Sequence, residues 1–393
     1  MKKHITVILT FLFIAFLFIV NNVKFYTYIK ATEASPSFLQ TKSLNKENTK
    51  IDSQAKTNSN SNFKSPNSFW RKWDSSLLGT KDDYEFKRAV GIGGWSKVYK
   101  ATHTPTGDQV AIKYPTYARE KSRLKKEFKI LDDMKNAPNF LKLIDLYEDK
   151  VGGKTTVIPV YEIFDKESYK KVLKHLDKAK LKYFMYETLR TLEYAHERGI
   201  IHRDIKPPNV LMNTKTKQVR VIDWGISEYY RPDRQLSTQV GTIPFKAPEV
   251  YLNMRAYDTK IDIWSAGCMF AEMAFQKPDF FKTERPKIKS LNYKDFRKKR
   301  TRELLDDIAQ VLGKDDLLKY TRKYKGSIND KNIMKYIGNY KKKSLGEFVN
   351  RKNRRLVDAL LVDLLESMLV IDHTIRITAS EALQHPYFDE VRH

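Results

Sequence analysis

The spacing of apolar residues divides the chain into three kinds of segment. An almost unbroken apolar run extends from Ile5 to Val20. Positions 23–68 are rich in Ser, Asn, Thr and Lys, and they hold too few apolar residues to offset the entropy of ordering. Farther on, apolar residues recur at the spacings of strands and helices. The pattern predicts a hydrophobic segment (1–22), a flexible linker (23–68) and a globular region behind them.

Strand and helix patterns alternate in the first part of the globular region. Residues 89–101, AVGIGGWSKVYKA, mix apolar and small residues and predict two strands joined by a glycine turn. A further strand is predicted at 110–112, within QVAIKY. The segment AREKSRLKKEFKILDDM places Leu124, Phe128 and Leu131 at helical spacing and predicts a helix.

A polar loop between two buried runs follows in the sequence IIHRDIKPPNVLM, residues 200–212. Pro207 and Pro208 prevent this loop from becoming helix. The next strand is predicted at Val219 to Ile222, and Gly225 just beyond it suits a turn. So many polar residues between apolar runs are difficult to explain by folding alone, which makes this loop a candidate site of chemistry.

Composition adds size, charge and redox class. With 393 residues, 41% of them hydrophobic, the chain can bury a large core in one two-lobed domain or two closely packed ones. A formal charge of +26 predicts attraction to acidic proteins, nucleic acid, heparin-like sugars or anionic lipid. The single cysteine, Cys268, excludes an intramolecular disulfide and is predicted to lie in the core, since IWSAGCMF surrounds it.

The amino-terminal apolar run has the length of a signal-peptide core and is slightly short for a membrane span. Either interpretation requires membrane insertion. Small residues that would suit cleavage first occur near Ala34, well downstream, which favours an uncleaved signal anchor. Lysines lie on both sides of the run, so its charges do not predict the orientation.

Three segments could hold a phosphorylated ligand. The glycines at 91, 93 and 94 would let backbone N–H groups approach phosphates, although such a hairpin is more often only a turn. Lys113 could bind phosphate oxygens or simply face solvent. Glu127 is either an ordinary residue of a solvated helix face or the partner that holds Lys113 in place.

The polar loop supplies candidates for a base and a metal ligand. Asp204 is a candidate acceptor of a hydroxyl proton, and Asn209, five residues on, a candidate metal ligand. A hairpin between Asn209 and Asp223 would bring both to one edge, with Trp224 packed beneath. Farther on, Glu249 of FKAPEV is expected to pair with Arg376 in a buried, structural ion pair.

The order of the glycine loop, VAIK, helix glutamate, HRDIKPPN, DWG and APE resembles that of eukaryotic protein kinases. More specifically, the chain is similar to the catalytic alpha subunit of casein kinase 2 in FMYETLRTLEYAHERGIIHRDIKPPNVL, RVIDWGISEYY, DIWSAGCMFAEM and SEALQHPYF. The stretch FWRKWDSSLLGTKDDYEF also resembles that family's amino-terminal segment, so the resemblance covers residue 69 to the end.

The resemblance implies an α+β, bilobal protein-kinase fold. A small β-rich N-lobe with one main helix would occupy 69–164, including the amino-terminal extension, and a larger, mainly helical C-lobe 165–393. It also implies a serine/threonine kinase that uses Mg²⁺ and ATP, with GTP as an alternative donor. Acidic protein substrates, little need for activation-loop phosphorylation and a casein kinase 2 beta-like regulatory subunit are further expectations, whereas nucleic acid is not an expected partner.

Individual roles follow from the same resemblance. Asp204 is the base, Lys206 binds the γ-phosphate, Lys113 and Glu127 position the nucleotide, and Asn209 and Asp223 bind the metal. Tyr161 would be the gatekeeper residue, next to the nucleobase of the nucleotide. The remaining nucleotide contacts are expected from the phosphate loop and the hinge: Gly91, Ile92, Gly93, Gly94, Trp95, Ser96, Val98, Glu162 and Ile163.

Two departures from that family qualify the expected substrate preference. Gln239 and Ile243 stand where arginines would be expected, so the acidic preference should apply several residues beyond the acceptor rather than immediately after it. The helix glutamate also lies one residue farther from Lys113 than expected, with Glu120 as a weak substitute. The basic residues expected to bind acidic substrates are Lys121, Arg123, Lys125, Lys126 and Lys246.

Two other classes of function remain open. A catalytically silent kinase fold could serve as a membrane-tethered scaffold, and a polyanion-binding protein would account for the charge but not for HRDIKPPN. The basic insert at about 280–305 is either a solvated surface segment or a docking site that depends on Arg297, Lys298, Lys299 and Arg300.

Overall fold

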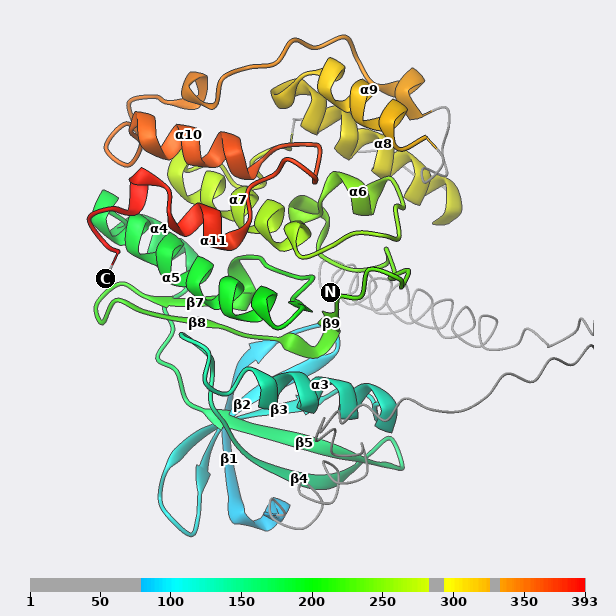
Figure 1. The fold of residues 1–393 in the computed structure, drawn as a ribbon. Coiled ribbons are helices and arrows are strands. Elements are labelled where there is room, and N and C mark those ends of the chain that lie inside the picture. Colours follow the sequence, from blue (N-terminus) through cyan, green and yellow to red (C-terminus); the bar gives the residue numbers. More distant parts are fainter. Residues whose placement is uncertain (1–78, 283–292, 326–332, 393) are drawn as a thin grey trace, which may run out of the picture. The chain divides into compact units, whose positions relative to one another are not determined.

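A computed structural model describes residues 79–282, 293–325 and 333–392 (Figure 1). The hydrophobic segment (1–22), the linker (23–68) and the start of the amino-terminal extension lie outside the described residues. The side chains of residues 293–300, on which the docking hypothesis for the insert depends, also lie outside them.

The N-lobe is an antiparallel five-stranded sheet with one helix beside it (Figure 1). The strand order is β1-β2-β3-β5-β4. Helix α3 (Lys121–Asp133) places Leu124, Phe128 and Leu131 in the same apolar core as the C-lobe helices, so it connects the two lobes. The strands are β1 (Tyr84–Ile92), β2 (Ser96–His103), β3 (Gln109–Pro115), β4 (Leu143–Val151) and β5 (Lys154–Glu162), after the 3-10 turn Lys81–Asp83.

Helices make up most of the C-lobe, and α7 (Lys260–Phe275) runs through its centre (Figure 1). Every residue of α7 after Lys260 is buried, including the predicted core residue Cys268, which is 1% exposed. The other helices are α4 (Tyr169–His175), α5 (Lys178–Glu197), α6 (Pro248–Tyr251), α8 (Tyr293–Leu312), α9 (Lys314–Lys323), α10 (Ala359–Met368) and α11 (Ala379–Leu383).

Two small hairpin-like sheets position the polar loops between the lobes. Strands β7 (Val210–Asn213) and β8 (Gln218–Val221) pair antiparallel, as the sequence predicts, although β8 begins and ends one residue earlier than expected. Strands β6 (Ile200–Ile201) and β9 (Glu228–Tyr229) pair in the same way. The bilobal fold with a β-rich N-lobe and a helical C-lobe is therefore confirmed. Within the described ranges, no helix is long and apolar enough to cross a membrane.

Candidate active site

The loop after β6 is held in place by one buried carboxylate, that of Asp262. Asp262 of α7 is 0% exposed and accepts hydrogen bonds from the backbone N–H groups of His202 (2.7 Å) and Arg203 (2.8 Å). Arg203 has a left-handed backbone, with φ of 70°, which a non-glycine residue adopts only where its surroundings enforce it. Local sequence patterns do not reveal this role of Asp262, because the residues that it contacts lie 59 and 60 positions away.

Asp204, in this loop, lies at the centre of a polar cluster that also includes the segment from Asp223 to Glu249, which we call the activation segment. One carboxylate oxygen is 2.7 Å from the Lys206 ammonium, and the other accepts a hydrogen bond from the Thr242 hydroxyl at 2.7 Å. Lys206 also donates to Thr242 (2.7 Å), and the Asn209 amide donates to the Asp204 carbonyl at 2.8 Å. The structure thus brings three predicted residues together and adds Thr242, which the sequence did not identify.

Asp223 follows β8 in a left-handed conformation, with φ of 68°. Its carboxylate is 2.6 Å from the Lys113 ammonium, and its side chain is 43% exposed. Burial would raise the pKa of Asp223, but the neighbouring Lys113 outweighs it and the net pKa is lowered from its ordinary value. Asp223 therefore stays ionised at neutral pH.

Trp224, directly after Asp223, is buried in the core at 3% exposure. Its indole ring contacts the His202 ring at a centroid distance of 4.6 Å and the Phe140 ring at 6.5 Å. The Ile222 N–H donates to the Asn209 carbonyl at 2.9 Å, so the two polar loops are connected directly. Asn209 and Asp223 therefore lie at the same edge, although 14 positions apart in the sequence.

The chemistry of these two side chains fits a magnesium ion. The Asn209 amide nitrogen donates to Asp204, which leaves the amide oxygen as a ligand, and Asp223 supplies a carboxylate. Mg²⁺ prefers such oxygen ligands and is usually held by one or two protein groups together with substrate phosphates. When bound, the ion would neutralise phosphate charge, and Lys113 would supply a further positive charge beside it.

The glycine turn between β1 and β2 has the openness that a phosphate loop requires. The Gly93 N–H donates to the Ser96 carbonyl at 2.8 Å and closes the turn. A Cβ on Gly94 would meet no atom within 4 Å, and Ile92 and Trp95 are 78% and 72% exposed. Gly91 lies opposite Val98 on the paired strand. Exposed backbone and side chains of this turn are thus free to cover a nucleotide.

The expected hinge begins at Glu162, the last residue of β5. The backbone N–H of Glu162 donates to the Lys142 carbonyl at 3.0 Å, and its carboxylate is 3.0 Å from Arg220. Ile163 is exposed just beyond. Burial raises the pKa of the preceding Tyr161 well above its ordinary value, so the candidate gatekeeper carries a neutral phenol.

The expected ion pair between Glu127 and Lys113 is not present in the structure. Glu127 points inward and is 2% exposed, but its ion pair is with Arg119 and not with Lys113, which instead binds Asp223. Arg119 lies in the connection between β3 and α3. The second carboxylate oxygen of Glu127 is buried without a hydrogen-bond partner. The substitute Glu120 is exposed at the start of α3.

Glu127 and Asp223 nevertheless lie close enough to share Lys113. A Cβ placed on Gly225 would be 3.5 Å from carboxylate oxygens of both residues. A buried oxygen without a partner is costly, so it marks a place where a donor fits. Arg119 therefore holds Glu127 in the site while one of its oxygens remains available to the Lys113 ammonium.

Replacing Arg119 by Met is expected to raise the KM for Mg-ATP several-fold and to lower the free energy of unfolding by about 1–3 kcal/mol, because Glu127 would stay buried without its cation. Steady-state kinetics and chemical denaturation would measure the two effects. Arg123→Met, at a 79% exposed position of α3, is the control and should change neither quantity. Unchanged kinetics in R119M would contradict the positioning role.

Helix α3 is also joined to the activation segment by charge. The Lys126 ammonium lies 2.8 Å from Glu228, and Arg203 lies 3.9 Å from the same carboxylate. Burial alone would raise the pKa of Glu228, but Lys126 and Arg203 outweigh it and the net pKa is lowered. Lys126, predicted to bind substrate, is thus already paired within the protein.

Lys126→Met is expected to cost about 1 kcal/mol at neutral pH, because Lys126 is one-third exposed and solvent screens part of the interaction. Because the pKa of Glu228 is lowered in the folded protein, the ionised carboxylate stabilises the fold at pH values above its ordinary pKa. This stabilisation is lost as the pH falls through the lowered pKa. The variant should therefore lose part of the acid-side dependence of the free energy of unfolding. Urea titrations from pH 7 to pH 3 would measure it, with Lys135→Met as the control.

The other predicted substrate residues occupy separate places. Arg123 is exposed on α3, Lys125 is on the same helix, and the side chain of Lys121 lies outside the described part. Lys246 lies near the end of the activation segment, and its ammonium is 5.6 Å from the centre of the Tyr251 ring. Their binding of acidic substrates stays a prediction.

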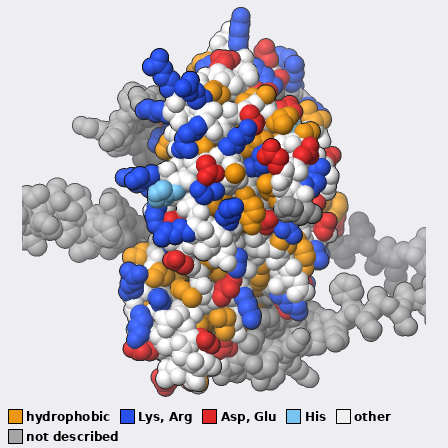
Figure 2. Space-filling view, turned by 90° about the vertical axis from the view of Figure 1, so that its left-hand side faces the viewer, with side chains coloured by type: hydrophobic (Ala, Val, Ile, Leu, Met, Phe, Trp, Pro, Cys, Tyr) orange, Lys and Arg blue, Asp and Glu red, His pale blue; other side chains and the backbone are white. Residues whose placement is uncertain are grey.

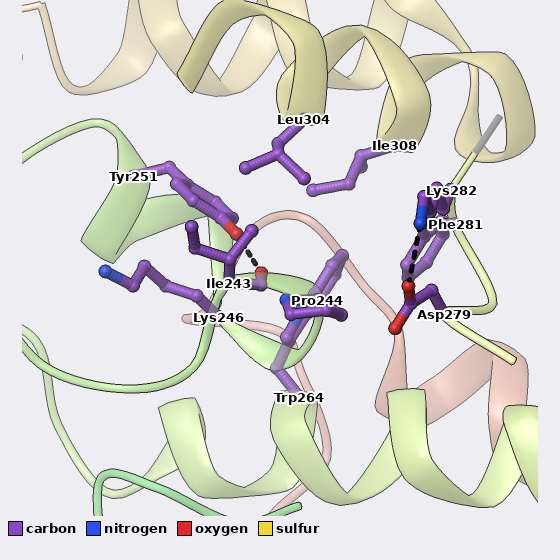
Figure 3. A pocket seen from close by; sticks show the side chains of 10 residues that line it. All are labelled: Ile243, Pro244, Lys246, Tyr251, Trp264, Asp279, Phe281, Lys282, Leu304 and Ile308. Carbon is purple, nitrogen blue, oxygen red and sulfur yellow. Dashed lines mark hydrogen bonds and ion pairs between the residues drawn. The ribbon is translucent and has the colours of Figure 1, made fainter. Parts of the chain in front are cut away.

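A pocket borders the activation segment on the side of α8 (Figure 3). Ile243 and Pro244 face Leu304 and Ile308 of α8 across it, while Lys246 points away from its centre. The Tyr251 hydroxyl donates to the Ile243 carbonyl and fixes this part of the backbone. The surface just after Thr242 is therefore largely apolar.

The predicted ion pair between Glu249 and Arg376 is confirmed. Two parallel hydrogen bonds, of 2.7 and 3.0 Å, join the guanidinium to the carboxylate, and both side chains are almost completely buried. Arg376 also donates to the carbonyls of Val370 (2.9 Å) and Lys260 (2.8 Å). The pair connects the end of the activation segment to the last part of the C-lobe.

A base with a nearby ammonium, two oxygen ligands for a metal and a glycine turn define a nucleotide-dependent phosphotransferase. The family model of the protein kinase domain matches residues 84–388, which is most of the chain. The chain belongs to the protein kinase family, and it is accordingly an enzyme of the protein kinase type that uses ATP and Mg²⁺.

Proposed function

We propose that this protein is a serine/threonine kinase of the casein kinase 2 type that phosphorylates acidic proteins, with ATP as donor and GTP as an alternative. The observation that carries the choice of acceptor is the 2.7 Å hydrogen bond from Thr242 to the base Asp204. It holds the activation segment directly against the base. A substrate lying along this segment would bring a short side-chain hydroxyl to Asp204, whereas a tyrosine would need a deeper site.

The acidic preference is proposed for positions beyond the residue that follows the acceptor. The apolar side chains of Ile243 and Pro244 beside Thr242 offer no charge to an acidic neighbour (Figure 3). Exposed Arg123, on α3, supports recognition of acidic residues farther along the substrate. The net charge of +26 would add attraction over a longer range.

Activity without phosphorylation of the activation segment is part of the same proposal. Glu228 provides a carboxylate between Lys126 and Arg203, at 2.8 and 3.9 Å. A negative charge in that position holds α3 and the catalytic loop to the activation segment. Since the carboxylate belongs to the chain itself, an added phosphate is not needed for this contact.

The test uses the full chain, Mg-ATP and a set of peptides with one acceptor each. Serine and tyrosine acceptors are compared first, and then acidic against neutral residues at the first and third positions after the serine. Transfer to serine, with higher kcat/KM for an acid at the third position than at the first, would support the proposal. ATP binding without transfer would indicate a scaffold, and transfer to tyrosine would overturn the choice of acceptor.

Two further proposals concern the location of the protein in the cell and its regulatory partner. The apolar run Ile5–Val20 would attach the protein to a membrane or lead it into the secretory pathway, as a retained anchor or a cleaved signal. A casein kinase 2 beta-like subunit is the proposed regulatory partner. Protease protection in sealed microsomes would test the attachment and its orientation.

A further inference from the structure

A turn of sequence NRKNRR, residues 350–355, is fixed from inside by a single buried side chain. Asn353 is 0% exposed, and its amide nitrogen donates to the carbonyls of Phe275 and Phe348, each at 3.0 Å. Its amide oxygen accepts from the Asn350 N–H at 2.8 Å. We call residues 350–355 the basic turn. Its backbone is held in place, while Arg351, Lys352 and Arg354 are exposed.

The basic turn adjoins the carboxyl end of α4. The Arg355 guanidinium donates to the Leu176 carbonyl at 2.5 Å, and Lys178 is 2.6 Å from Asp358. Exposed Lys174 lies on α4 two residues before Leu176. This side of the molecule faces the viewer in Figure 2, where Lys and Arg side chains gather over the upper part, the C-lobe.

The cations of this surface have few acidic neighbours to satisfy them. Glu167, Asp177 and Asp358 each pair with a lysine, namely Lys171, Lys180 and Lys178. Exposed Glu347, just before Val349, instead accepts a hydrogen bond from the Ser344 N–H at 3.1 Å. The described part of the chain offers no ion pair to Lys174, Arg351, Lys352 or Arg354. These four positive charges are thus available to an anionic partner.

Exposed apolar side chains flank the same surface and narrow the choice of partner. Val349, just before the basic turn, is 38% exposed, and Leu360, at the start of α10, is 44% exposed. A soluble polyanion would use the cations alone. An anionic bilayer would use both kinds of side chain, because phosphate headgroups attract the cations and the interfacial region accepts apolar groups.

We propose that the basic turn, with Lys174, Val349 and Leu360, docks the kinase domain onto an anionic phospholipid surface. The contact is peripheral and separate from the catalytic cluster. It does not depend on the proposed substrate preference, and a membrane attachment at residues 1–22 would strengthen it. The predicted linker has 46 residues (23–68), and a flexible chain of that length would reach roughly 35–40 Å, which would let the domain meet a bilayer bound by residues 1–22.

The single buried cysteine makes a direct test practicable. Burial raises the pKa of the Cys268 thiol well above its ordinary value, so a cysteine introduced as Leu360→Cys would be labelled selectively. An environment-sensitive dye at position 360 of the full chain is then compared on vesicles of neutral phosphatidylcholine and on vesicles containing 30% phosphatidylserine. Emission is normalised to the vesicle-bound protein, which sedimentation measures.

A blue shift with at least a two-fold rise in emission is expected on the anionic vesicles only. The triple variant R351Q/K352Q/R354Q should abolish it, whereas R88Q/K150Q/K154Q, which removes the same charge from exposed N-lobe positions, should retain it. Both variants should phosphorylate a soluble peptide normally, which separates this result from the proposed function. Equal loss in both variants, no shift on either vesicle, or binding to heparin without a lipid-dependent shift would overturn the proposal.

Discussion

Replacing Asp204 by Asn is expected to lower kcat by roughly 10²–10⁴-fold, the range that a positioned general base contributes. Asn keeps the shape of the side chain but cannot accept the proton of a substrate hydroxyl. It also removes the negative charge that faces Lys206 at 2.7 Å. Asp204 is expected to face the hydroxyl of the protein substrate, whereas the glycine turn between β1 and β2 is expected to cover the nucleotide. The KM for Mg-ATP should therefore change little.

The measurement is steady-state phosphate transfer to a serine peptide, together with thermal unfolding to verify the fold. Asp233→Asn is the matched control, because Asp233 is exposed in the same activation segment and should tolerate the change. Asp204 is only partly buried, so D204N should remain folded. A kcat within three-fold of the unmodified protein would show that another group takes the proton.

The sequence was sufficient to predict the parts of the site that depend on short-range order. Asp204 and Asn209 belong to one loop between two apolar runs, and Asp223 follows the adjacent strand of the same hairpin. A turn between two short strands leaves little choice of register, so these residues had to meet at one edge. The burial of Trp224 was equally predictable, because a large aromatic residue directly after a buried strand is expected to pack in the core.

Apart from Glu249 and Arg376, whose pairing was expected from the motif, the partners of charged side chains were not predictable in the same way. Glu127 has Lys113, Arg119 and neighbouring helix cations within a short stretch of sequence, and the choice among them depends on the path of one connection and on rotamers. Lys126 finds its partner 102 residues away, on the activation segment. Periodicity identifies which face of a helix is buried but not which acid meets which base.

Only the fold shows where on the surface the excess positive charge lies. The composition indicates an excess of cations, and most of the surface proposed to bind lipid lies in or near NRKNRR in the sequence. Lys174 comes from α4, and Arg355 contacts the carbonyl of Leu176, just after that helix, across 179 positions. Only the tertiary structure reveals that the neighbouring carboxylates are already paired, and so which cations remain available.

Arg376→Met is expected to have the largest effect on stability, about 3–5 kcal/mol, because it leaves Glu249 charged and buried without its partner. Glu249 is 0% exposed, and Arg376 supplies both of the hydrogen bonds that its carboxylate receives in the described structure. The pair joins the end of the activation segment to the segment before α11. Its loss should therefore loosen the segment that carries Thr242 and reduce activity as well as stability.

Chemical denaturation of R376M, E249Q and the double variant would separate the pair from its surroundings. If the cost arises from an unpaired buried charge, the double variant should be more stable than R376M, since E249Q removes that charge. The free backbone carbonyls of Val370 and Lys260 would keep it below the unmodified protein. Equal stability of R376M and the double variant would instead indicate that packing of Arg376 against Trp264, at 5.1 Å, dominates.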